Sequence, residues 1–473
     1  MTALNSQKTN YSALITLTTV FFFWGFVAAS NDILIPVFKE ELKLAQWQSQ
    51  MISFAFYVAY TVGSLLYVLM SYVLKRDVLN KIGYKKGISL GLIISAIGTL
   101  LFIPAANLES FPLMISGLFV VGLGFSLQQT AANPLVISLG DEKTGSQRLS
   151  LAGGVNNIGT TIGPVLIALA IFGTTSSADV DVSIESIKVP YLILGLAFLI
   201  VATLIHFSKI PNHITSNNSS EDESKAKSIK NYPQLYLGMI AIFVYVGVEV
   251  ATAGNLGEYL KVSYGMDSSM VTPYVSLYWA SLMIGRWSSA ASVFSSKQNI
   301  QLFLKFILPY GAFGVFVLVN SITHQDLTSL YYYAFVIIVL IIAEHLSKGN
   351  PSRQLALFSV LGIIALLIGM FTTGLTSIYA LISVGLFCST LWPCIFTLAI
   401  TGLGATTNKG SGYLIMMIMG GGFISLFQGV LVDINSIGIR YSFFVGVICF
   451  AYLLFYALKT PNIFLKQGVT VKE

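Results

Sequence analysis

Apolar stretches of about 20 residues recur along the whole chain, and this spacing limits the possible folds more than any other feature. A helix needs about 20 residues to cross the roughly 30 Å hydrocarbon core of a bilayer. Charged residues make up 10% of the chain, whereas soluble domains carry about 25%. Segments of about ten residues with alternating polarity, which are typical of a transmembrane barrel, do not occur in the sequence. We therefore predict an all-α polytopic membrane protein.

The predicted spans fall into two groups separated by a polar break. The first group covers 11–36, 48–74, 84–103, 110–139, 149–173 and 188–207. The second group covers 233–261, 270–293, 300–320, 329–344, 354–372, 374–401, 410–432 and 440–458. This pattern predicts six spans before the break and eight after it, which makes about fourteen transmembrane helices.

The polar break, Thr215–Lys230, reads TSNNSSEDESKAKSIK and has the composition of a flexible linker. We predict a first helical bundle over residues 1–210, a cytoplasmic linker over 211–232 and a second bundle over 233–473. In transporters built from two membrane halves, the substrate site lies between the halves. A channel or a membrane enzyme could also have two halves, so this organisation alone does not define the function.

Lysine and arginine are concentrated in alternate loops. The loop after the second predicted span carries Lys75, Arg76, Lys81, Lys85 and Lys86. Because cytoplasmic loops carry an excess of Lys and Arg, this bias predicts a multi-pass protein of the inner membrane with both termini in the cytoplasm. The same bias accounts for the net charge of +6 without a nucleic-acid partner.

The sequence offers no strong motif of an enzyme or of an ATP-driven pump. It contains no His-Glu-x-x-His pair and no phosphate-binding Gly-x-x-x-x-Gly-Lys-Ser/Thr loop, and its one Gly-x-Ser-x-Gly match, Gly87–Gly91, lies within the predicted apolar span 84–103. Cys388 and Cys394 have no histidine neighbours, which favours buried structural thiols over metal ligands. We predict no enzymatic activity, no cofactor and no bound metal.

Two isolated carboxylates stand within predicted spans. Asp32 is the only formal charge in the segment VFFFWGFVAASNDILIP, and Glu249 lies in YVGVEVATAGNLG. An ionisable group at membrane depth is costly unless it faces a cavity or a partner, so it indicates a functional site. We predict that Asp32 drives transport, with Glu249 as a second candidate.

Amide and aromatic side chains within the spans could hold a sugar. Amides make directional hydrogen bonds to hydroxyl groups without carrying charge, and aromatic rings can stack on the apolar face of a sugar ring. The alternative interpretation is that the amides only join neighbouring helices, and that the aromatic rings are membrane-interface anchors or core residues. The predicted substrate-binding residues are Asn31, Gln128, Gln129, Asn133, Asn156, Asn157, Asn255, Tyr278, Trp279 and Trp392.

Several motifs together resemble those of one transporter family. They are FFWGF, NDILIP, KIGYKKG, QTAANP, RLSL, YWASLMIGR, LWPCIFTLAITGLG and KGSGYLIM, and they extend over residues from about 20 to 420. With these motifs, the chain resembles the fucose/glucose/galactose-type sugar–cation symporters of the major facilitator superfamily. The resemblance implies a fold of two six-helix bundles and a central cavity in which Asp32 takes part in proton coupling.

The chain departs from the family pattern at several positions. Fucose-type members carry a glutamate where this chain has Gln129, whereas glucose/galactose-type members carry glutamine, so the resemblance implies a hexose substrate. Gly153 stands where the fucose branch has a glutamine. The family has twelve spans, so the count of fourteen predicts an inserted helix hairpin at about 329–372. The loop around Leu74–Asn80 is also longer than in the family.

The sequence thus predicts cation-coupled uptake of a hexose such as glucose, galactose or a related sugar, by alternating access. Proton and sodium both remain open as the co-transported cation. The alternatives are an uncoupled sugar facilitator and a non-transporting sugar sensor on the same fold, and a channel is disfavoured because no filter motif is found. The expected partners are a small-molecule sugar and the lipid bilayer, and we expect a monomer.

Overall fold

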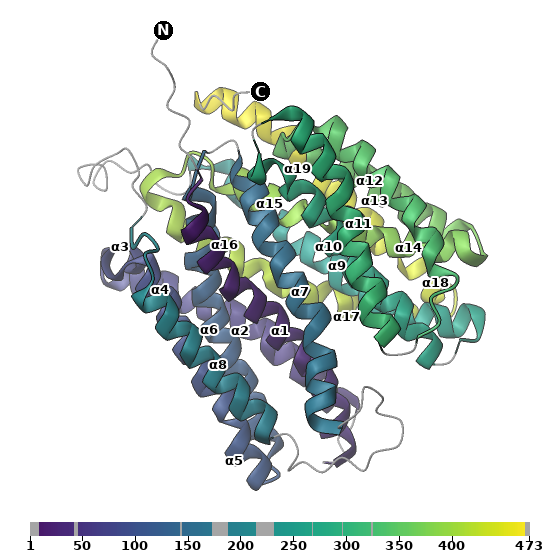
Figure 1. The fold of residues 1–473 in the computed structure, drawn as a ribbon, viewed down its shortest axis with the longest axis horizontal. Helices are drawn as coiled ribbons and strands as arrows, with labels where there is room; N and C mark the ends of the chain where they lie inside the picture. The colour runs from purple at the N-terminus through teal and green to yellow at the C-terminus, as the bar shows by residue number, and fades with distance from the viewer. Residues whose placement is uncertain are drawn as a thin grey trace. The chain divides into compact units, whose positions relative to one another are not determined.

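A computed structural model describes residues 9–41, 46–141, 144–172, 188–213, 231–266, 268–295, 297–322 and 325–468. Only the backbone is described for the helix residues 29–41, 46–53, 164–172, 268–269 and for residue 405. All regular elements in these ranges are helices (Figure 1). This agrees with the predicted all-α class.

The helices up to the polar break are α1 Tyr11–Glu41, α2 Gln46–Val73, α3 Val78–Ile82, α4 Tyr84–Leu100, α5 Phe102–Asn107, α6 Phe111–Ser138, α7 Gly145–Phe172 and α8 Lys188–Phe207. Those after it are α9 Pro233–Tyr264, α10 Ser268–Phe294, α11 Gln298–Ile322, α12 Tyr333–Ser347, α13 Pro351–Phe371, α14 Gly374–Cys388, α15 Leu391–Ile400, α16 Thr407–Met416, α17 Gly420–Val432, α18 Gly438–Ser442 and α19 Phe444–Gln467. Single 3₁₀ turns precede α12 and α16 and separate α16 from α17.

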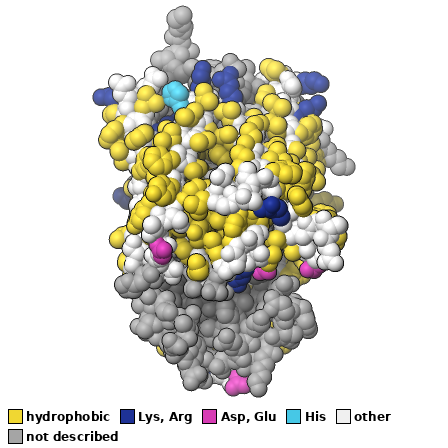
Figure 2. Space-filling model, turned by 90° about the vertical axis from the view of Figure 1, so that its right-hand side faces the viewer, with side chains coloured by type: hydrophobic (Ala, Val, Ile, Leu, Met, Phe, Trp, Pro, Cys, Tyr) yellow, Lys and Arg dark blue, Asp and Glu magenta, His cyan; other side chains and the backbone are white. Residues whose placement is uncertain are grey.

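Twelve helical stretches among the described residues are long and apolar enough to cross a membrane. Figure 2 shows hydrophobic side chains over most of the described part of one face, with Lys and Arg mainly toward its upper edge. Helices α7 and α10, of 28 and 27 residues, do not belong to those twelve stretches. The twelve stretches confirm a multi-pass membrane protein, whereas the count of fourteen stays a prediction.

The chain divides by packing into two compact units. The first comprises Met1–Glu142, Ile158–Ala226 and Gly404–Met416, and the second comprises Lys143–Asn157, Lys227–Leu403 and Met417–Glu473. The first unit therefore includes a segment from after the polar break, Gly404–Met416, and the second unit includes a segment from before it, Lys143–Asn157. The predicted domain limits at 210 and 233 stay a prediction.

In the first unit, helices α4 and α6 approach closely through glycines. A Cβ atom added to Gly124 would lie 2.5 Å from the carbonyl oxygen of Gly91, and one added to Gly91 would lie 2.8 Å from that of Gly124. Real Cβ atoms do not approach a backbone oxygen so closely, so both positions need glycine. Small residues at helix crossings allow this packing, which is typical of membrane bundles.

The loop that the sequence predicts to be long forms the short helix α3. Asp77 caps this helix by accepting a hydrogen bond from the backbone N–H of Asn80 at 3.0 Å. Its buried carboxylate also accepts from the Tyr67 hydroxyl at 2.9 and 3.0 Å and from the Asn408 amide at 3.0 Å. Asn408 lies on α16, so this carboxylate joins α2, α3 and α16 within the first unit.

Cys388 and Cys394 are buried and their thiols are free, as predicted. Cys388 ends α14, and α15 begins three residues later at Leu391. Ser389 and Thr390 form the break between the two helices. The break leaves the buried backbone carbonyl of Ser389 free of a helical hydrogen bond, and the Arg286 side chain donates to it.

Candidate functional site

The predicted site residues are distributed over both units. In the first unit, Gln128 on α6 is fully buried. Its Oε1 accepts a hydrogen bond from Trp24 Nε1 at 2.6 Å, and its Nε2 donates to Ser95 Oγ at 2.9 Å. The Gln128 amide therefore joins α1, α4 and α6 through both of its polar ends. Its predicted role as a sugar ligand stays a prediction.

Gln129 and Asn133 lie one helical turn apart on α6 and share a face. Gln129 Nε2 donates to the hydroxyl of Tyr60 on α2 at 3.0 Å. Asn133 is 1% exposed, and its Nδ2 has no hydrogen-bond partner among the described residues. Buried polar groups without a partner are rare and point to a function or to a missing ligand or water. Among the predicted sugar ligands of this unit, Asn133 has the clearest need for a further partner.

Replacing Gln128 by leucine is expected to lower the stability of the protein by about 1 kcal/mol, because it leaves the Trp24 indole N–H without an acceptor, whereas Ser95 Oγ keeps its bond to the Val121 carbonyl. The measurement is the melting temperature of the purified protein in detergent, together with its affinity for sugar. Gln129→Leu is the matched control, and we expect it to weaken sugar binding with a smaller loss of stability. Equal loss of sugar affinity in both variants, with unchanged stability, would assign Gln128 to the sugar instead.

Asn31 and Asp32 lie on α1, and their side chains are outside the described part of the chain. The role of Asp32 in cation coupling and that of Asn31 in sugar binding therefore stay predictions. Upstream on α1, Trp24 is buried, with its indole N–H bonded to Gln128.

In the second unit, Glu249 is half-buried on α9 and sits among tyrosines. The hydroxyl of Tyr245, one turn earlier, donates to Glu249 Oε2. The hydroxyl of Tyr278 on α10 donates to the backbone carbonyl of Glu249 at 2.9 Å. Trp392 on α15 lies next to Tyr245, with their ring centroids 6.3 Å apart. The structure thus brings three predicted site residues, Glu249, Tyr278 and Trp392, to one region of this unit.

Arg286 on α10 joins three segments of the second unit. Its Nε donates to the carbonyl of Ser389 at the break between α14 and α15, at 3.0 Å. Its Nη1 donates to Asn157 Oδ1 at 2.5 Å and to the carbonyl of Gly153 at 3.3 Å, both on α7. The arginine therefore satisfies a carbonyl that the helix break releases.

Gly153 and Asn157 are adapted to this arginine. A Cβ added to Gly153 would lie 3.2 Å from Arg286 Cδ, which is a tight contact, so a larger residue here would push against the arginine side chain. Asn157 Nδ2 also donates to the carbonyl of Trp279 at 3.4 Å. Asn157 thus bonds α7 to α10 through both ends of its amide.

The remaining predicted ligands are less closely gathered. Asn156 is half-buried on α7. Asn255 Nδ2 donates within its own helix to the carbonyl of Ala251 at 2.8 Å. The Trp279 ring lies edge-on to Tyr278 with centroids 5.7 Å apart. The residues predicted from the sequence did not include Tyr60 or Tyr245, because a tyrosine in an apolar span has no distinguishing spacing.

The sequence model of the Major Facilitator Superfamily matches residues 13–344. The chain belongs to the major facilitator superfamily. Within the superfamily, it is 34% identical over 459 residues to a protein of Brucella abortus named glucose/galactose transporter, covering 97% of this chain and 96% of the relative. It is 31% identical over 467 residues to a putative glucose/galactose transporter of Helicobacter pylori, covering 96% and 98%.

A solved structure of the superfamily has the same fold. The crystal structure of FucP in the outward conformation matches with a TM-score of 0.71 and 26% identity, over 94% of this chain and 98% of that chain. The L-fucose-proton symporter of Escherichia coli is 26% identical over 461 residues, covering 93% of this chain and 91% of the relative. These findings confirm the predicted resemblance and the major facilitator fold.

Proposed function

We propose that the chain takes up a hexose together with a proton, by alternating access across the inner membrane. The observation that carries the proposal is the 34% identity, over nearly the whole chain, to a relative named glucose/galactose transporter. The relative named L-fucose-proton symporter supports the proton as the coupled cation. The glutamine at position 129 favours a glucose- or galactose-type substrate over fucose.

The proposed coupling residues are Asp32, in the first unit, and Glu249, in the second. Protonation of Asp32 from outside would favour the sugar-loaded state, and release of the proton inside would follow a change of access. A ligand shifts a two-state equilibrium only by its difference in affinity for the two states. The proton must therefore bind the outward-facing and inward-facing states with unequal affinity.

In the proposed sugar site, amides bind the hydroxyl groups and aromatic rings cover the apolar face of the sugar. Asn133 supports this assignment in the first unit, because its buried amide nitrogen lacks a partner among the described residues. Trp392 and Trp279 are the aromatic candidates in the second unit. Glu249 would stand beside these rings, held by the hydroxyl of Tyr245.

We also propose that the chain crosses the membrane fourteen times, with α7 and α10 added to the twelve apolar stretches, and with both termini in the cytoplasm. In the second half, α13 packs on α14, α15 and α19 in the way that α4 packs on α6 and α8 in the first half. In this correspondence, α11 and α12 have no counterpart. The added helix pair would then be α11 and α12, earlier in the chain than the 329–372 hairpin predicted from sequence alone.

The experiment that tests the function is sugar uptake into proteoliposomes under an imposed gradient. We expect an acid-outside pH gradient to drive accumulation of glucose or galactose above the external concentration, and a sodium gradient to have no effect. Accumulation driven only by sodium would replace the proton with sodium. Exchange without accumulation would indicate an uncoupled facilitator, and binding without counterflow would indicate a sensor.

A further inference from the structure

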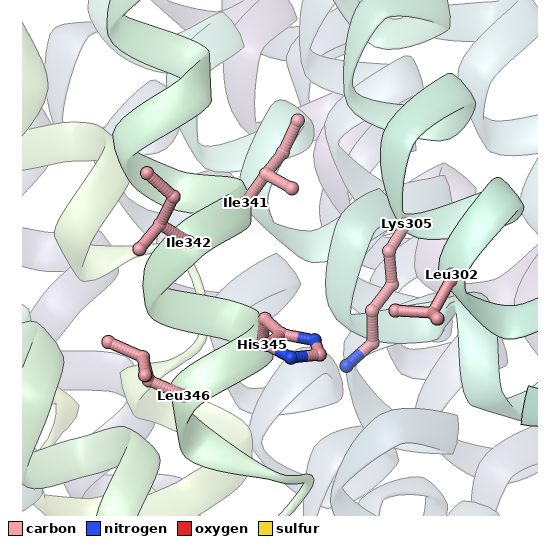
Figure 3. Close-up of a pocket in the computed structure, with 6 residues that line it drawn as sticks. All are labelled: Leu302, Lys305, Ile341, Ile342, His345 and Leu346. Carbon is pink, nitrogen blue, oxygen red and sulfur yellow. The ribbon is translucent and has the colours of Figure 1, made fainter.

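A groove lies between α11 and α12, and none of its lining residues is among those proposed for transport. It has a volume of about 360 Å³ and is lined by Leu302, Lys305, Ile341, Ile342, His345 and Leu346. Figure 3 shows Lys305 on one wall and His345 on the other, with the ammonium group directed toward the imidazole ring. The groove thus combines an aliphatic lining with two nitrogen-bearing side chains that converge.

The ammonium group of Lys305 retains capacity to bind an anion. Its Nζ donates to the backbone carbonyl of Glu344 at 3.5 Å, which is a long hydrogen bond. The Glu344 carboxylate is buried and accepts from Gln354 Nε2 on α13 at 2.6 Å. No acidic residue lines the groove. An ammonium carries three donor hydrogens, and this backbone bond uses one of them.

The surroundings of the groove are suited to a lipid. Leu302, Ile342 and Leu346 are 42%, 54% and 56% exposed, so they present hydrocarbon to the membrane. The groove lies near the end of α12, where exposed Lys348 follows. This is the end that the loop charges predict to face the cytoplasm. Long basic side chains near helix ends extend their charge toward the interface.

We propose that this groove binds an anionic phospholipid of the cytoplasmic leaflet. Lys305 and His345 hold the phosphate, and the acyl chains lie along Leu302, Ile342 and Leu346. Basic pockets between membrane helices on the cytoplasmic side bind anionic headgroups. The volume of the groove equals that of about twelve water molecules. This is enough for the phosphate and glycerol of the lipid, while its acyl chains lie outside the groove. A second, apolar protein helix in this position would bury the Lys305 ammonium in hydrocarbon and add no counter-charge to the buried Glu344 carboxylate, with which Lys305 already interacts.

The test is a titration of the purified full-length protein in neutral detergent with dioleoyl-phosphatidylglycerol, read as bound lipid by native mass spectrometry. Dioleoyl-phosphatidylcholine, which has the same chains, and inorganic phosphate form the comparison arms. We expect phosphatidylglycerol to bind at least about five times as tightly as phosphatidylcholine. We also expect that inorganic phosphate does not displace the bound phosphatidylglycerol. Equal binding of the two lipids, or displacement by millimolar inorganic phosphate, would overturn the proposal.

Variants assign the lipid to this groove. Lys305→Gln is expected to weaken phosphatidylglycerol binding about fivefold, as for loss of one basic residue near an anionic group. Lys305 also bonds the backbone carbonyl of Glu344, so a second variant is needed that leaves this bond intact. His345→Gln, at an exposed position, is that variant, and we expect it to weaken phosphatidylglycerol binding as well. Lys466→Gln removes the same charge at the exposed end of α19 and is the control. Binding reduced no more by the two groove variants than by Lys466→Gln would refute the assignment.

Discussion

Asp32→Asn is expected to abolish the accumulation of sugar against its gradient while sugar exchange continues. Asparagine keeps the size and hydrogen-bonding capacity of the side chain but cannot bind and release a proton. With one proton per sugar, a pH difference of one unit corresponds to about 1.4 kcal/mol and so to about tenfold accumulation. In the variant, the ratio of internal to external sugar should fall to about one. The measurement is uptake and counterflow of labelled sugar in proteoliposomes.

Asp326→Asn is a matched control for this experiment, because it removes a carboxylate outside the membrane spans. Hydrogen bonds from the backbone N–H and hydroxyl of Thr328 hold the pKa of Asp326 below its ordinary value. With its pKa lowered, Asp326 stays ionised at every pH of the assay and takes up no proton, so its replacement should leave accumulation unchanged. Concentrative uptake that persists in Asp32→Asn but disappears in Glu249→Gln would transfer the coupling role to Glu249.

Arg286→Lys is expected to reduce transport by about ten- to a hundredfold, equivalent to about 1.4–2.7 kcal/mol. The guanidinium bonds Ser389, Asn157 and Gly153 at the same time, and a single ammonium on a flexible chain cannot reproduce this planar fork. The helix break at Ser389 and the Gly153–Asn157 segment of α7 would lose their common anchor. The measurement is sugar counterflow, with size-exclusion chromatography to verify folding.

A double-mutant cycle distinguishes this role from a general loss of charge. Asn157→Leu alone should also reduce counterflow, and combined with Arg286→Lys it should add little, because the two residues share one interaction. Arg353→Lys makes the same replacement of arginine by lysine at the exposed start of α13, and we expect it to leave counterflow unchanged. Additive losses in the double variant would show that Arg286 acts independently of Asn157.

The class of fold could be predicted from the sequence because its signal is local. Apolar stretches of bilayer length and the polar segment Thr215–Lys230 are visible without any tertiary contact. Most helix boundaries lie near the predicted ones, since turns and polar residues interrupt hydropathy at those points. The main exceptions are α19, which continues to Gln467 beyond the predicted end at 458, and the predicted spans 374–401 and 410–432, each of which is broken into two helices. The family motifs carried the prediction further, to the superfamily that the comparisons confirm.

The partners of individual polar residues could not be predicted in this way. Gln128 and Gln129 are neighbours in sequence with the same chemistry, yet Gln128 is enclosed by Trp24 and Ser95 whereas Gln129 reaches Tyr60. Successive residues on a helix point about 100° apart, so they meet different neighbouring helices. Which helices those are depends on packing over the whole bundle.

The sequence by itself determined that this protein is a helical, multi-pass membrane protein, because a bilayer imposes length and polarity on each segment separately. Only the tertiary structure decided what the polar residues do. It joined Arg286 to a helix break more than a hundred residues later, and it bonded Asp77 to Asn408 across 331 positions. It also placed Lys305 and His345 on the two walls of one groove. Such contacts depend on helices that are distant in sequence and meet only after the bundle has packed.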